Sequence, residues 1–366
     1  MKDRTAEKKR MKLILSGIFL GGGLFLAAAA RAVPGFGQWY CAHIYLVLVN
    51  CIGRVAGWVP FSISEVLLYV LLLLLLGTGA RLIFLKIRGR LERGAASRWG
   101  RSVLLTGTVL FFLYMLNCGV NYYRNSFTEI TGIQTDAYTV RELARTCEWL
   151  TREVNQYASQ VERDEEGLAK IDDQVGDKAA EAMEAAGERY PGLSGYYPNP
   201  KGLLNPWLLS VQQLSGIYAP FTIEANYNTA MTDYNLPFTA CHELSHLRGF
   251  MREEEANFIA FLACRESEEP EFQYSGSLLG WINCMNVLYQ ADYQTWEEIH
   301  DKICPEVKAD LAANNEFWAQ YDGRVAEVAD QVNDNYLKAN GQEAGVQSYD
   351  RMADLIVVWY LADELE

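Results

Sequence analysis

Residues 236–264, LPFTACHELSHLRGFMREEEANFIAFLAC, decide the architecture of the C-terminal half of the chain. From Pro237 onward the stretch is helix-forming, and proline suits a first helical turn because the N–H it lacks has no partner there. His242, Glu243 and His246 form an HExxH pattern. Positions i and i+4 of a helix lie on one face, so both imidazoles can reach the same ion. The stretch therefore predicts a helix that carries two metal ligands.

The residue types in this pattern indicate a particular chemistry. Histidine nitrogens bind Zn²⁺ at about 2.0–2.1 Å. A carboxylate beside the first ligand can take a proton from a zinc-bound water and pass it to a leaving amine. The chain has four histidines, and two of them fall in this pattern. The sequence thus predicts a zinc metallopeptidase with His242 and His246 as ligands and Glu243 as catalytic base. The alternative is a half-buried helix with two structural histidines.

A third ligand must come from outside this helix. Three acidic residues follow it, namely Glu253, Glu254 and Glu255. In an unbroken helix Glu253 would lie roughly 10 Å from His246 along the axis, at about 1.5 Å per residue. The chain must therefore reverse within residues 248–251, where Gly249 can adopt the required conformation. Glu253 is the predicted third ligand, with either following glutamate as the alternative, and Asn257 is expected to hydrogen-bond a ligand.

Charge divides the chain into two unlike parts. Residues 1–118 contain 15 Lys and Arg against 4 Asp and Glu, a net charge of +11. Residues 119–366 contain 17 against 42, a net charge of −25, and the two parts sum to −14. A basic apolar part followed by an acidic part is typical of a membrane protein with a large water-exposed domain. Nucleic acid is excluded as a partner because the acidic part would repel phosphates.

Three segments are long and apolar enough to cross a bilayer, which takes about 20 helical residues. They are residues 13–30, 63–85 and 103–120. The first is read as an uncleaved anchor, with a signal peptide as the alternative. Residues 39–58 are interrupted by polar and small residues and predict an interfacial helix, with a fourth span as the alternative. Aromatic residues expected at headgroup level are Trp39, Tyr40 and Trp58.

Two basic clusters predict the orientation of these segments. The first precedes residue 13, and the second occupies residues 86–101 between the second and third spans. Because Lys and Arg concentrate on the cytoplasmic side, both clusters place these regions in the cytoplasm. Everything after about residue 121 is then expected outside the cytoplasmic membrane.

The C-terminal part reads as mainly α. Residues 138–190 predict two or three helices with an acidic loop near residues 172–177. A Pro- and Gly-rich loop follows, and residues 217–228 predict one or two short strands. We therefore expect a membrane part over residues 1–120 and an α-rich catalytic domain with a small β element over residues 121–366.

Other chemistry-bearing residues have weaker support. Glu224 could bind a substrate amine, but a surface salt bridge is the preferred interpretation. His300 is interpreted as structural, and Tyr336 and Tyr349 are possible oxyanion donors. The eight cysteines form no CxxC pair, which favours buried free thiols over a cysteine zinc cluster.

The segments HELSHLRGFMREEEANFIAFLA, APFTIEANYN and NDNYLKANGQEAGVQSYDRMADL resemble a bacterial family of membrane proteins known as a domain of unknown function. HExxHxxG resembles the metzincin pattern, but the third ligand of that family would fall on Arg252. The core motif is more similar to gluzincins of the CaaX-prenyl-endoprotease, HtpX and ImmA/IrrE types. That resemblance implies zinc, an α-rich catalytic domain and peptide-bond hydrolysis. The competing functions are a non-catalytic zinc-binding sensor or scaffold of the cell envelope, and a zinc amidase acting on envelope material.

Overall fold

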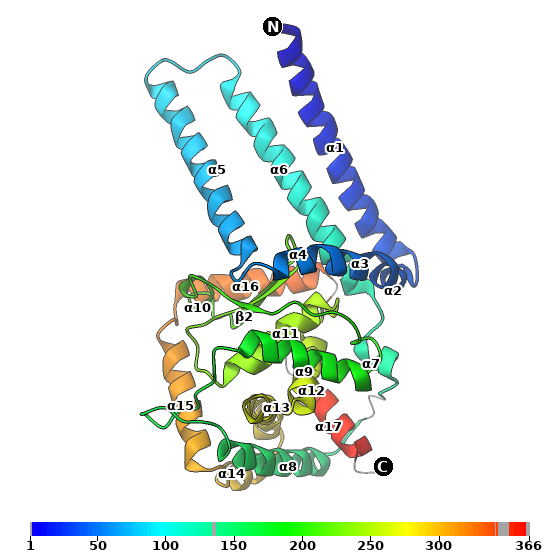
Figure 1. Ribbon diagram of the computed structural model, residues 1–366, viewed down its shortest axis with the longest axis vertical. Coiled ribbons are helices and arrows are strands. Elements are labelled where there is room, and N and C mark those ends of the chain that lie inside the picture. The colour runs from blue at the N-terminus through cyan, green and yellow to red at the C-terminus, as the bar shows by residue number, and fades with distance from the viewer. Residues whose placement is uncertain (1, 134–136, 341, 343–350, 364–366) are drawn as a thin grey trace.

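The computed structural model describes residues 2–133, 137–340, 342 and 351–363 (Figure 1). Within them the chain is mainly helical with one small sheet, and apolar helices come first. The predicted fold class is confirmed. Tyr349 lies outside the described residues, so the structure gives no place for it.

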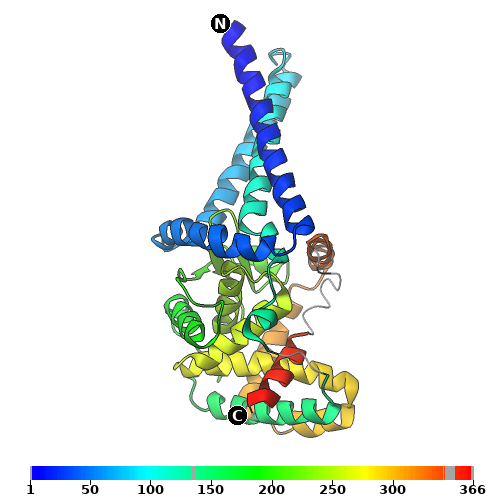
Figure 2. The same cartoon turned by 90° about the vertical axis from the view of Figure 1, so that its right-hand side faces the viewer.

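Three long helices project from one end of the folded part: α1 (Lys2–Ala32), α5 (Ile63–Ile87) and α6 (Ala95–Asn117) (Figures 1 and 2). Each contains a stretch long and apolar enough to cross a membrane. The third span was expected to reach residue 120, but α6 ends at Asn117. The next residues form a 3₁₀ helix, η3 (Gly119–Tyr123), because Val120 and Tyr122 are buried in the core of the folded part.

Residues 36–57 form one nearly continuous helix with two π-helical segments. Its parts are α2 (Phe36–Tyr40), η1 (Cys41–Tyr45), α3 (Leu46–Leu48), η2 (Val49–Gly53) and α4 (Arg54–Gly57). This helix is long and apolar enough to span a membrane, yet it lies across the ends of the three long helices (Figures 1 and 2). Trp39 and Trp58 are exposed as expected, whereas Tyr40 is buried. Its hydroxyl donates to the Leu116 carbonyl at 2.7 Å, so it is not available to headgroups. The interfacial location stays a prediction.

The remaining elements complete the folded part. Its helices are α7 (Phe127–Thr131), α8 (Val140–Ala158), α9 (Val175–Arg189), α10 (Trp207–Ser210), α11 (Asn235–Leu247), α12 (Glu253–Glu266), α13 (Pro270–Ala291), α14 (Tyr293–His300), α15 (Pro305–Ala319), α16 (Arg324–Ala339) and α17 (Arg351–Asp363). Helix α13 packs against α8, α11, α12 and α17, with buried side chains along most of its length. Helices α8 and α9 are the helices predicted for residues 138–190.

The sheet contains β1 (Lys201–Gly202), β2 (Gly216–Ala219) and β3 (Glu224–Tyr227) in the order β1-β3-β2. Strand β3 is parallel to β1 and antiparallel to β2, with Tyr218 opposite Ala225. Strands β2 and β3 confirm the short strands predicted for residues 217–228. Because β3 is central, one side of β2 has no strand partner within the described residues. Helix α11 packs against both β2 and β3.

Candidate metal centre

Helix α11 is held in place by burial of most of its surface. The residues from Pro237 to Leu247 are buried except for His242, which is partly exposed. The N–H of Phe238 lies in the first turn, where donors have no acceptor within the helix. It donates instead to Ser275 Oγ of α13 at 3.1 Å. The helix that carries the HExxH pattern is therefore fixed in depth and rotation by the core.

The chain reverses direction at Gly249, as the sequence requires. Helix α11 ends at Leu247, and Gly249 has a left-handed backbone with φ of 97°. Its N–H donates to the His246 carbonyl at 2.9 Å, and the N–H of Phe250 donates to the Ser245 carbonyl at 3.1 Å. This pair of bonds is a Schellman motif, which satisfies carbonyls left open at a helix end. Helix α12 then starts at Glu253 and packs back against α11.

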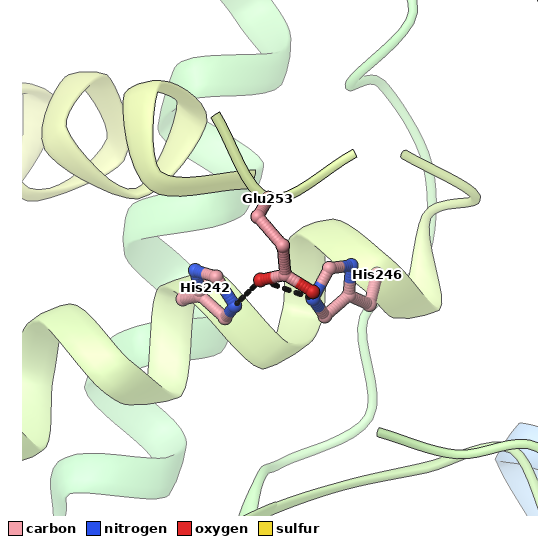
Figure 3. A group of neighbouring side chains, drawn as sticks. All are labelled: His242, His246 and Glu253. Carbon is pink, nitrogen blue, oxygen red and sulfur yellow. Dashed lines mark ion pairs between the residues drawn. The ribbon is translucent and has the colours of Figure 1, made fainter. Parts of the chain in front are cut away.

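The reversal brings Glu253 against both histidines (Figure 3). Glu253 Oε2 lies 3.4 Å from His242 Nε2 and 3.6 Å from His246 Nε2. One ligand atom from each residue lies within 4.8 Å of the others. The side chains of His242 and Glu253 are each 12% exposed, so the cluster is reachable from solvent. Glu253, proposed from sequence as the third ligand, is thus the acidic residue that meets both imidazoles.

These separations suit an ion better than direct hydrogen bonds. An N–H···O bond has a donor–acceptor distance of about 2.7–3.2 Å. Two atoms each about 2.0–2.2 Å from a tetrahedral zinc ion lie about 3.3–3.6 Å apart. The measured distances of 3.4 and 3.6 Å fall in the second range. The donor set of two imidazoles and one carboxylate also fits zinc.

His246 is oriented by its other ring nitrogen. Its Nδ1 lies 2.8 Å from the carbonyl oxygen of Phe250, which can accept a hydrogen bond from the Nδ1–H tautomer. That tautomer leaves Nε2 with a free lone pair facing Glu253, as a metal-binding histidine requires. Phe250 follows Gly249, so the chain reversal supplies this orienting carbonyl as well as Glu253.

The charges in the cluster are strongly coupled. Burial favours the neutral imidazole of His246, but the Glu253 carboxylate outweighs it and raises the pKa of His246. Burial likewise opposes ionisation of Glu253, yet His246 and His242 hold the pKa of that carboxyl well below its usual range. The site thus holds Glu253 as a carboxylate, and a metal ion would compete with a proton on His246.

Glu243 is buried beside this cluster. Its Oε2 has no hydrogen-bond partner within the described residues. On the other side it lies close to Gly216, where an added Cβ would come within 2.5 Å of Glu243 Oε1. Burial raises the pKa of Glu243 to about 7, although His242 and His246 act to lower it. An unpartnered buried carboxyl with a raised pKa is costly for stability and is typical of a functional site.

Glu254 and Glu255, the alternative third ligands, have other hydrogen-bond partners. Glu254 Oε2 accepts from Gln342 Nε2 at 3.2 Å. Glu255 is buried and accepts from the N–H of Phe127 at the start of α7, at 3.0 Å. Asn257 makes no side-chain hydrogen bond to a histidine of the cluster in the described part of the chain. The acceptor of His246 Nδ1 is the Phe250 carbonyl instead, and the expectation that Asn257 hydrogen-bonds a ligand stays a prediction.

Glu224 is not a surface residue. It is 3% exposed, and Oε1 accepts from Lys201 Nζ at 2.5 Å. It also accepts from the N–H groups of Ile63 and Ser64 at the start of α5. The predicted surface salt bridge is therefore a buried ion pair between β1 and β3, and the same carboxylate also joins β3 to the start of α5.

The two remaining sequence candidates lie outside the cluster. His300, at the end of α14, stacks on Trp296 with ring centroids 4.7 Å apart, in keeping with a structural role. The Tyr336 hydroxyl accepts from Tyr122 Oη at 3.2 Å. In the described part of the chain its ring packs on Tyr114 and Tyr122, and no hydrogen bond joins it to the His–Glu cluster.

Sequence reasoning missed two residues that support the end of α11. The Tyr45 hydroxyl donates to the Leu247 carbonyl at 2.8 Å, and Arg124 Nη1 donates to the Arg248 carbonyl at 3.1 Å. Both satisfy carbonyls at the C-terminal end of the helix. Tyr45 belongs to the helix over residues 36–57, and its position in an apolar run gives no sign of this role. The N-terminal apolar segments and the folded part thus share a core.

Fold and cluster together define a class: a mainly helical protein with membrane-type apolar helices and a His–His–Glu cluster on two packed helices. The chain belongs to the family described as protein of unknown function (DUF3810), whose model matches residues 40–357. The match includes both helices of the cluster and most of the apolar segments. No curated protein and no solved structure matches the chain.

Proposed function

We propose that this protein is a membrane-anchored, zinc-dependent metallopeptidase that hydrolyses peptide bonds outside the cytoplasmic membrane. The observation that carries the proposal is the spacing of His242, His246 and Glu253, which fits a tetrahedral ion, beside the unpartnered Glu243 carboxyl. A purely structural site would have no use for a buried carboxyl next to its first ligand.

Each residue has a defined role in the proposal. His242, His246 and Glu253 would hold zinc, and two neutral imidazoles with one carboxylate leave a fourth position open for catalysis. Zinc bound there supplies Lewis acidity, which polarises a carbonyl and lowers the pKa of water. Glu243 would take a proton from the water that attacks the peptide carbonyl and pass it to the leaving amine. The pKa of Glu243, raised to near neutrality, suits this proton transfer.

The sheet edge favours a peptide as the substrate. Strand β2 has a side without a strand partner within the described residues, and the backbone groups of such an edge can pair with an extended peptide. Gly216, the first residue of β2, lies directly against Glu243. A peptide added along β2 would therefore pass close to the proposed base.

The proposed location of the folded part outside the cytoplasmic membrane is based on the distribution of charge. The basic N-terminal region and the basic loop between α5 and α6 lie at the end of the molecule away from the folded part (Figure 1). If both basic regions are cytoplasmic, the folded part is on the other side of the membrane.

The experiment is hydrolysis of a peptide library by the full chain, purified in detergent with zinc and read by mass spectrometry. Glu243→Gln should retain zinc and lose about 10²–10⁴ in rate, the usual contribution of a general base. Glu254→Gln, on the same turn as Glu253, is the matched control and should cleave like wild type. Zinc binding without cleavage by any of the three proteins would favour the scaffold, and cleavage of envelope amides alone would favour the amidase.

A further inference from the structure

Helix α16 carries a row of exposed apolar side chains. Val325, Val328 and Val332 are 59%, 58% and 63% exposed, and Tyr336 continues the row. Their spacing of three and four residues places them on one face of the helix. Leu337 is the one buried residue of α16. The helix is therefore attached to the rest of the protein mainly along one edge and at its ends. An apolar row of this kind in water indicates a binding surface.

The charged residues of α16 lie on the opposite face. At 100° per residue, from 3.6 residues per turn, Glu327, Asp330 and Asp334 fall about half a turn away from the valine row. The helix is therefore amphipathic, with its carboxylates directed away from whatever covers the valines. The valine row is therefore suited to contact with an apolar surface, and not with a basic protein partner.

The position of α16 relates this face to the membrane. Helix α16 lies beside the ends of the long apolar helices, at about the level of the helix over residues 36–57 (Figures 1 and 2). Tyr336 packs its ring edge-on against Tyr114 of α6, with centroids 6.2 Å apart. The Tyr336 ring also packs edge-on against Tyr122 of η3, with centroids 6.1 Å apart, so this end of the valine row lies beside the junction of α6 and η3, where α6 would leave the bilayer.

Helix α16 is also tied to the ends of two of the apolar helices. Arg31 Nη2 donates to the Ala339 carbonyl at 3.1 Å, and Arg31 lies in the last turn of α1. The Tyr114 hydroxyl donates to Asn340 Oδ1 at 2.7 Å. These bonds fix the C-terminal end of α16 where a bilayer around α1 and α6 would end.

We infer that α16 is an interfacial helix that docks on the lipid bilayer through Val325, Val328 and Val332. The occupant of this face is the surface of the same membrane that α1, α5 and α6 would span. An amphipathic helix of this type buries its apolar face about 5–10 Å into the boundary between headgroups and acyl chains. The inference does not depend on zinc or on peptide hydrolysis.

The test uses the full chain in phosphatidylcholine nanodiscs, with Cys51→Ser and Cys304→Ser to remove the two cysteines that are not buried. A bimane label is placed singly by Val325→Cys, Val328→Cys or Val332→Cys, and by Glu327→Cys, Asp330→Cys or Asp334→Cys as matched controls on the opposite face of the same helix. Leu73→Cys on α5, at a residue 71% exposed, is the lipid-facing reference. Quenching is measured with acyl-chain nitroxide lipids and with iodide in water.

The valine positions should be quenched by lipid nitroxide to at least half the level at Leu73→Cys, and the three controls mainly by iodide. Quenching by lipid nitroxide should rise and fall along α16 with the period of a helix. Equal lipid quenching on both faces, or valine positions reached by iodide and not by lipid, would overturn the inference. Valine positions shielded from both quenchers would also overturn it, because another part of the chain would then cover the face.

Discussion

Replacement of Gly249 by alanine tests whether the chain reversal builds the candidate site. Gly249 has φ of 97°, a conformation that costs L-residues roughly 1–2 kcal/mol. A Cβ there would also lie 3.1 Å from both Cys41 Sγ and Arg124 Nη1 and 3.3 Å from Tyr45 Cε1. Tyr45 and Arg124 hydrogen-bond to the end of α11, so a shift of either side chain would disturb that end of the helix.

The effect has two parts of predictable size. In a domain of this size 1 kcal/mol changes the melting temperature by about 2–4 °C, so the backbone cost alone lowers it by about 2–8 °C. We expect these contacts to displace Phe250, whose carbonyl orients His246, and with it Glu253 at the start of α12. Loss of an orienting partner weakens metal binding by about 10–100-fold, and we expect Gly249→Ala to weaken zinc binding by that factor.

The control is Gly132→Ala at the end of α7. Gly132 has φ of 76°, and an added Cβ would meet no atom within 4 Å. It carries the same kind of backbone cost without a new side-chain contact. The assay is thermal unfolding in detergent together with zinc competition against a chromophoric chelator. Equal zinc affinities of the two variants would refute the claim that the reversal positions the ligands.

Three further predictions concern protonation, the buried ion pair and orientation. Since the pKa of His246 is raised from 6.5 to about 9, its contribution to stability is complete below pH 6.5 and is lost as the pH rises through 9. The zinc-free protein should therefore lose stability across this window in thermal melts, and His246→Ala should lack this part of the slope. Lys201→Met should destabilise the fold by about 3–5 kcal/mol because it leaves the Glu224 carboxylate buried without its cation, and Lys201→Met with Glu224→Gln should cost less in denaturant unfolding. A reporter fused after Glu366 should be active only outside the cytoplasm, whereas cytoplasmic activity would contradict the orientation inferred from the basic clusters.

The local parts of the site were predictable from sequence. HExxH fixes two side chains on one helical face, and chain geometry alone requires a reversal before Glu253. Gly249 is the glycine in that interval, and the structure gives it the left-handed backbone that the reversal needs. These inferences depend on residues close together in the chain.

The parts that failed depend on contacts between distant segments. Glu224 looks exposed in a polar strand, but Lys201 and the start of α5 bury it. Tyr40 has the composition of an interfacial aromatic residue, yet α6 covers it. The Phe250 carbonyl has no side-chain signature at all, so its bond to His246 could not be read from the residue type. Each case needed a partner that sequence spacing does not specify.

The sequence also predicted only part of how the apolar helices are arranged. Composition identified three long apolar helices, but it could not decide between a crossing and an interfacial position for residues 36–57. That helix packs one side on the folded part, where Tyr45 supports the end of α11. A site in the folded part therefore depends on a segment that sequence assigns to the membrane.

The most direct test of the central claim is the zinc content of the full chain purified without chelators, measured by inductively coupled plasma mass spectrometry. We expect about one zinc per chain for wild type and for Glu254→Gln, consistent with three protein ligands and one open position. Almost no zinc is expected for His246→Ala and for Glu253→Gln. Wild-type protein without zinc, or His246→Ala with as much zinc as wild type, would contradict the proposed metal site.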